Sequence, residues 1–168
     1  MEQLIESMKV LHATNFAFYL KIHFFHWNVT GPNFPQYHKF FQKLYEEIFD
    51  SVDSVAEHIR SIEGYAPGSF QRFKELSLIQ DQIEVIPASQ MFNQALSDNN
   101  IVIMALKNAY NLANAQGEVG LANFLQDRID THKKHGWMLR STDGISSLAV
   151  DGANKLSSDM NGHISTTV

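Results

Sequence analysis

Apolar residues recur at spacings of three, four and seven along most of the chain, which is the pattern of amphipathic helices. The first stripe lies in residues 2–29, and a Gly- and Pro-containing stretch at 29–33 interrupts it. A second stripe covers residues 44–62, with Pro35 just inside the expected start of its helix. Glycines and a proline at 64–68 end this helix. The first two helices are therefore expected to form one hairpin.

Two further stripes follow a long connection over residues 65–88, in which we expect one short helix at 70–78. Ser89 is the expected N-cap of the third helix, which extends to Ala113, and the fourth stripe covers residues 121–139. Strand-type alternation is absent over any useful length. Two helical hairpins joined by a long connection predict an all-α four-helix bundle with a crossover.

Composition narrows the class of protein. With 168 residues, 44% of them apolar, the chain is long enough for one domain with a hydrophobic core. We assign residues 1–143 to the bundle and 144–168, rich in Ser, Thr, Gly and Asp, to a polar tail. The absence of cysteine excludes disulfides, thiolate metal sites and cysteine nucleophiles. No apolar run is long enough to span a membrane, and the first residues lack the cationic start of a secretory signal, so we expect a cytoplasmic protein.

Histidines and carboxylates concentrate in residues 23–57. Imidazole nitrogen and carboxylate oxygen together suit iron, manganese or zinc. Asp53 and Glu57 are four residues apart and project from one helical face. For Glu46 and Glu47 we favour a plainer interpretation, a solvated acidic face. The set comprises His23, His26, Trp27, His38, Glu46, Glu47, Asp50, Asp53 and Glu57.

The candidate ligands cannot meet within one straight helix. His38 and Asp53 lie on the same expected helix, and fifteen residues at about 1.5 Å each separate them by roughly 22 Å. A two-fold dimer resolves this, because antiparallel copies of the helix bring the start of one beside the end of the other. His26 and His38 of one chain would then face Asp53 and Glu57 of its partner. The intrachain alternative is weak, since no glutamate in the sequence begins the Glu-x-x-His motif of bundle di-iron proteins.

One run of residues resembles a known family. His26-Trp27-Asn28-Val29-Thr30-Gly31-Pro32-Asn33-Phe34, followed by His38, Asp53 and Glu57, is similar to the Dps family, the DNA-protection-during-starvation mini-ferritins. Lys134-His135-Gly136-Trp137-Met138-Leu139-Arg140 is similar to the end of that family's fourth helix. The resemblance covers about residues 2–143.

The resemblance implies a ferritin-like bundle, with a short helix in the long connection, assembled as a hollow homododecamer. It implies up to two irons at each two-fold interface, bound by His26 and His38 of one subunit and by Asp53 and Glu57 of its partner. Trp27 resembles the tryptophan that flanks this centre, although a packed aromatic is the plainer interpretation. The implied activity is oxidation of Fe(II), preferably by hydrogen peroxide, and storage of ferric mineral inside the shell, which protects against oxidative damage.

Two departures from the family pattern bear on function. Gln42 stands where many members carry an acidic residue, which weakens a second iron position, and Glu46 is a possible substitute. The lysine-rich arm of some members is missing: Lys9 is the only Lys or Arg among the first twenty residues, and the formal charge is −5. DNA binding is therefore expected to be weak or absent. A DNA-compacting protein and a metal-binding shell without turnover stay as alternatives.

The remaining candidates receive plainer expectations. His12, His58 and His163 are expected at the surface or partly buried, and His23 is a candidate support for the metal ligands. Asp127 and Asp130 match the acids that line pores in the family, although solvated helix-face acids are the commoner case.

Overall fold

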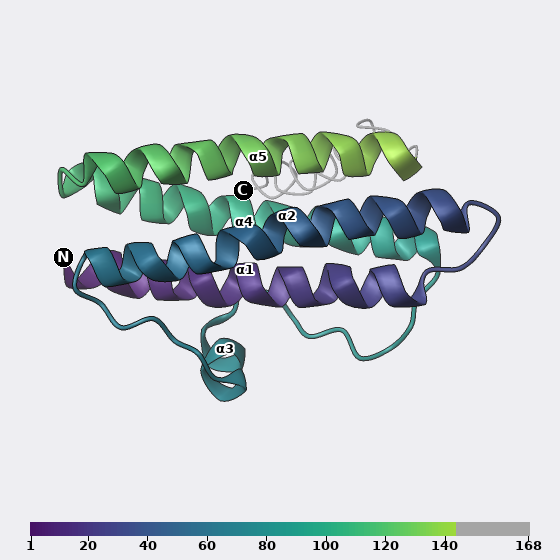
Figure 1. The fold of residues 1–168 in the computed structure, drawn as a ribbon, viewed down its shortest axis with the longest axis horizontal. Helices are drawn as coiled ribbons and strands as arrows, with labels where there is room; N and C mark the ends of the chain where they lie inside the picture. Colours follow the sequence, from purple (N-terminus) through teal and green to yellow (C-terminus); the bar gives the residue numbers. More distant parts are fainter. Residues whose placement is uncertain (144–168) are drawn as a thin grey trace, which may run out of the picture.

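The computed structural model describes residues 1–143, which form five helices and no strand. Four long helices lie side by side and a short one stands on the connection between them (Figure 1). In chain order they are α1 (Glu2–Asn28), α2 (Phe34–Ser61), α3 (Phe70–Leu76), α4 (Ala88–Ala115) and α5 (Val119–Asp143). The predicted polar tail at 144–168, with His163, lies outside the described residues.

The long helices are two antiparallel hairpins, α1–α2 and α4–α5, and α1 also packs against α4 (Figure 1). The segment after α2 returns along the whole bundle before α4 begins at the opposite end, so a long connection is required. Its short helix α3 packs against α1. The predicted all-α four-helix bundle with a helix-containing crossover is confirmed.

The predicted stripes form the core between these helices. In α1, the large apolar side chains of the stripe are at most 1% exposed, and each contributes about 1.5–3 kcal/mol by leaving water. Asn15 interrupts that stripe, and its Nδ2 donates to Ser51 Oγ of α2 at 2.9 Å, whereas its buried Oδ1 has no hydrogen-bond partner within the described residues. The stripe residues of α1 are Leu4, Met8, Leu11, Phe18, Ile22 and Phe25.

Two local predictions are wrong. Helix α4 begins at Ala88 with Pro87 as its N-cap, so Ser89 lies inside the first turn and caps nothing. Proline takes that position because its fixed φ, here −57°, suits the residue that leads into a helix. His12 is not at the surface but 4% exposed, because α3 covers this part of α1 and the Phe73 ring packs edge-on against the imidazole.

A buried ion pair joins the two hairpins. Lys21 Nζ on α1 lies 2.7 Å from Asp98 Oδ2 on α4, and both side chains are at most 4% exposed. Gln94 Nε2 donates to the other carboxylate oxygen at 2.9 Å. The two charges therefore compensate each other inside the bundle. None of the helices within residues 1–143 is both long and apolar enough to cross a membrane.

Candidate metal centre

His26 and His38 are held together at the closed end of the α1–α2 hairpin. His26, near the end of α1, places its Nδ1 2.8 Å from the backbone oxygen of His38. His38, in the first turns of α2, places its Nδ1 2.8 Å from the backbone oxygen of His26. The two rings stack with their centroids 3.7 Å apart. We call this reciprocal arrangement the histidine clamp.

The clamp fixes which nitrogen of each ring is available to a metal. A carbonyl oxygen only accepts hydrogen bonds, so both Nδ1 atoms must carry the hydrogen and donate. In a neutral imidazole the other nitrogen, Nε2, then holds the lone pair. Backbone carbonyls orient metal-binding histidines in this way in many proteins. Two Nε2 lone pairs on half-buried, oriented rings form a donor set suited to a divalent transition metal.

Aromatic side chains surround the clamp. The Phe34 ring lies 5.0 Å from that of His38, and the Tyr45 ring lies edge-on to His26 at 5.2 Å. Trp27 is 59% exposed. Within one chain it is therefore not a packed core aromatic, which was the plainer interpretation of this residue from the sequence. Its ring lies 4.1 Å from that of His23. His23 stands beside the clamp without a hydrogen bond to either clamp histidine. Its pKa is lowered by burial and, to a smaller extent, by the neighbouring His26.

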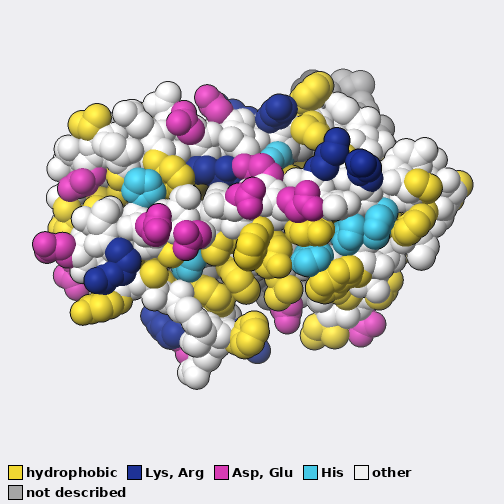
Figure 2. Space-filling view, viewed as in Figure 1, with side chains coloured by type: hydrophobic (Ala, Val, Ile, Leu, Met, Phe, Trp, Pro, Cys, Tyr) yellow, Lys and Arg dark blue, Asp and Glu magenta, His cyan; other side chains and the backbone are white. Residues whose placement is uncertain are grey.

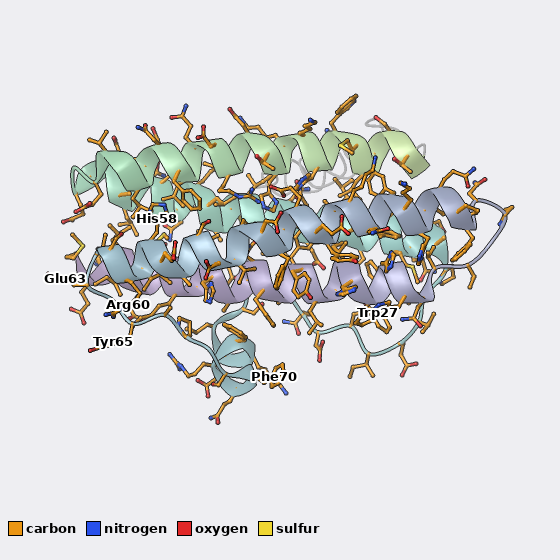
Figure 3. The ribbon with its side chains drawn as sticks, viewed as in Figure 1. Trp27, His58, Arg60, Glu63, Tyr65 and Phe70 are labelled. Atoms are coloured by element: carbon orange, nitrogen blue, oxygen red, sulfur yellow. The ribbon has the colours of Figure 1, made fainter. Side chains whose placement is uncertain are left out.

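Asp53 and Glu57 do not join the histidines within one chain. Both are exposed on α2, whose length puts Asp53 roughly 22 Å from His38 along the axis. No group of three or more His, Asp or Glu side chains close enough to share a metal ion occurs in residues 1–143. In Figure 2 histidines gather at the right of the α1–α2 pair and acidic side chains lie farther left. Trp27 and His58 lie near opposite ends of the bundle in Figure 3.

Comparison with known proteins shows the family to which the chain belongs. A family model described as a ferritin-like domain matches residues 6–144. The DNA protection during starvation protein of Brevibacillus brevis is 31% identical over 142 residues, covering 83% of this chain and 95% of that protein. The chain belongs to the Dps family.

Two further comparisons agree. DNA protection during starvation protein 2 of Bacillus anthracis is 29% identical over 140 residues, covering 83% of this chain and 96% of that protein. The crystal structure of a Dps protein from Bacillus brevis superposes with a TM-score of 0.81 at 28% identity, covering 84% of this chain and 95% of that one. The ferritin-like fold of a Dps protein is therefore shown for this chain.

In this Dps chain, the neighbouring acids Glu46 and Glu47 of α2 have different surroundings. Glu46 is exposed and accepts a hydrogen bond from Gln42 at 2.8 Å, as expected for a solvated side chain. Glu47 is different: its carboxylate accepts from Arg128 on α5 and lies 3.2 Å from His135 Nε2. The interpretation of Glu47 as a solvated acid is therefore wrong, because α5 supplies a cation beside it.

A third oriented histidine was not predicted. His132 on α5 is 1% exposed, and its Nδ1 lies 2.8 Å from Asn99 Oδ1 on α4, while Asn99 Nδ2 donates to the His132 backbone oxygen at 2.9 Å. Its Nε2 lone pair faces Arg128 at 3.3 Å. Burial, then the neighbouring His135 and the positive charge of Arg128, lower the His132 pKa well below its usual value. The sequence did contain a signal for this cluster, because the spacing of Arg128, His132 and His135 places them on one face of the helix.

The other predicted candidates lie away from the clamp. His58 is half-buried as expected, with its ring 4.3 Å from that of Phe124. Asp127 and Asp130 are exposed on α5, and Asp130 is 3.5 Å from Lys133 Nζ. A pore lined by these two acids requires several subunits, and it stays a prediction.

Proposed function

We propose that this Dps protein oxidises Fe(II) with hydrogen peroxide at sites shared between two subunits and stores the ferric mineral inside a closed homododecamer. The observation that carries the proposal is the histidine clamp, a built pair of metal donors that no carboxylate within residues 1–143 approaches closely enough to share a metal ion. Each site holds up to two irons as substrate. His26 and His38 come from one subunit, and Asp53 and Glu57 from its partner.

A second subunit is favoured by the apolar surface beside the clamp. Leu20, Trp27, Phe49 and Phe70 are each more than 40% exposed, which is costly for a lone chain. A groove of about 530 Å³ between α1 and the α3 segment is lined by three of them, together with Phe16 and Phe24 among others. Hydrophobic side chains gather over the α1–α2 face in Figure 2. A two-fold partner would cover this surface and bring its α2 carboxylates to the clamp.

The donor set suits the proposed reaction. Two Fe(II) ions give one electron each to hydrogen peroxide, which takes up two protons and leaves as two water molecules. Carboxylate oxygens favour Fe(III) over Fe(II) because hard anionic ligands prefer the higher charge. Glu57 is the expected anchor, with Asp53 beside it, and the neutral imidazoles of His26 and His38 hold the ion without adding charge. Trp27, exposed beside the clamp, is the expected flanking aromatic.

The test uses two variants, one with His26→Ala and His38→Ala and one with Asp53→Ala and Glu57→Ala. Each alone should lose peroxide-dependent iron oxidation, because every site lacks half of its ligands. Co-expression should restore about a quarter of the wild-type rate, because about half of the dimers are mixed and each mixed dimer holds one complete site and one empty one.

Matched controls are His58→Ala and Asp50→Ala, which alter the same residue types on α2 outside the ligand set and should keep the wild-type rate. Size-exclusion chromatography must show that both double variants and the mixture assemble like the wild type. Absence of recovery in verified mixed assemblies would overturn the shared site, since a site within one chain cannot be rebuilt by mixing.

A further inference from the structure

A continuous row of aromatic rings leads away from the histidine clamp. The Tyr45 ring lies 5.2 Å from the candidate ligand His26. Tyr45 in turn stacks on His23, with centroids 3.9 Å apart and planes 17° from parallel. Tyr19 lies one turn before His23 on α1, and its ring is 5.6 Å from that of His23. The row therefore passes from the clamp to α2 and back to α1 without a gap wider than a ring contact.

The far end of the row pairs a phenol with a base. Tyr19 Oη lies 3.2 Å from His23 Nδ1, within hydrogen-bond distance for a phenol O–H donating to an imidazole lone pair. A tyrosine loses an electron far more readily when its proton has an acceptor in place. Phe49 also packs against the Tyr19 ring, with the centroids 5.0 Å apart, so the phenol is held among rings. Within residues 1–143, no hydrogen bond of this kind is made by Tyr45.

A neutral side chain, that of Gln42, lies next to the clamp at the position where a second iron would need a carboxylate. Gln42 follows His38 by one helical turn, and its Nε2 donates to Glu46 at 2.8 Å. An amide binds a cation more weakly than a carboxylate does. A site that holds only one Fe(II) supplies one electron, whereas hydrogen peroxide needs two to become water. Without another reductant the product would include a hydroxyl radical.

We propose that Tyr19 supplies this second electron through Tyr45, and that His23 accepts the Tyr19 proton. In the balanced step, one Fe(II) becomes Fe(III), Tyr19 becomes a neutral tyrosyl radical, and His23 becomes imidazolium. Hydrogen peroxide takes up both electrons and two solvent protons, its O–O bond breaks, and two water molecules leave. This inference rests on the proposed function, because it needs peroxide to be reduced at the clamp.

The test is rapid-freeze electron paramagnetic resonance of the assembled protein, loaded anaerobically with one Fe(II) per subunit and mixed with one equivalent of peroxide. The wild type should show a tyrosyl radical, and Tyr19→Phe should lose it while a spin trap records more hydroxyl adduct. Tyr45→Phe should delay the radical, because its phenyl ring is harder to oxidise. Tyr110→Phe, a tyrosine on α4 outside the row, should match the wild type.

His23→Phe separates the proton acceptor from the ring. It keeps an aromatic ring in the row and removes the base, so the radical yield should fall while Fe(II) binding is retained. An equal radical and an equal spin adduct in the wild type and Tyr19→Phe would overturn the inference. A wild type that oxidises iron with peroxide but forms no tyrosyl radical would overturn it while leaving the proposed function intact. A wild type that oxidises no iron would overturn the proposed function instead.

Discussion

Asp98 is a single residue whose removal is expected to destabilise the fold strongly, because its charged partner is buried with it. Its carboxylate is 2% exposed and lies 2.7 Å from Lys21 Nζ, which is 4% exposed. Such a pair gains little over apolar residues of the same shape, because both ions lose their hydration. Removing only one partner is much worse, since the other charge is then left in the bundle without compensation.

We therefore expect Asp98→Ala to lower the free energy of unfolding by about 3–5 kcal/mol. The double variant Lys21→Met with Asp98→Leu should recover most of this loss, because it removes both charges and keeps the volume. Urea unfolding at pH 7 and one fixed protein concentration measures both. Asp127→Ala, which removes an exposed carboxylate of α5, is the control and should change the free energy by about 0.5 kcal/mol or less. An Asp98→Ala variant as stable as this control would contradict the expectation.

At the scale of elements, charged and titratable side chains link α2 to α5 beside the shared apolar core. Glu47 of α2 faces Arg128 and His135 of α5. Burial lowers the His135 pKa to about 4, against the opposing pull of Glu47 and with help from the positive charges of Arg128 and Lys134. The folded protein therefore favours the neutral form of His135.

This arrangement predicts a loss of stability in mild acid. The unfolded chain binds a proton at His135 near pH 6.5 and the folded chain only near pH 4, so stability falls as the pH drops through this interval. The contribution of His135 is at most about 3 kcal/mol. His135→Gln should have a flatter stability profile between pH 6.5 and pH 4 in urea unfolding. A variant with the same slope as the wild type would show that other groups carry the pH dependence.

The helices were predictable because their signal is local, whereas several contacts were not because their partners lie on other helices. The apolar stripe from Leu4 to Phe25 predicted α1 and its buried face. Nothing near Glu47 in the sequence indicates Arg128, which lies 81 residues away. His12 is buried by α3, which follows it by nearly sixty residues. The Nδ1 bonds of the clamp depend on how the α1–α2 hairpin closes, so the sequence indicated His26 and His38 as ligands but not their orientation.

At the scale of the whole molecule, the net charge of the protein determines whether it attracts a large charged partner such as DNA. The chain carries 13 Lys and Arg against 18 Asp and Glu, a formal charge of −5. The proposed assembly would multiply this negative charge, and a polyanion gains no counterion release by approaching such a surface. The relatives named for DNA protection therefore share the fold with this chain without implying that it binds DNA directly.

We expect no retention of duplex DNA in a gel-shift assay of the assembled protein at about 150 mM salt near neutral pH. Light scattering on the same sample should show a closed assembly well above the 19.1 kDa of one chain. A complex that survives raised salt would mean that assembly creates a basic surface absent from the single chain. A monomer in solution would contradict the shared site as well.

The histidine clamp affects how well the α1–α2 hairpin tolerates insertions in its loop. Each of its two hydrogen bonds joins a side chain of one helix to the backbone of the other, so the clamp, together with the apolar core, holds the register of α1 against α2. The loop at 29–33, with Gly31 at a φ of +116°, then only has to connect two ends that are already fixed. We expect insertions there to alter the loop without turning the imidazoles, so the proposed metal donors are insulated from changes of loop length.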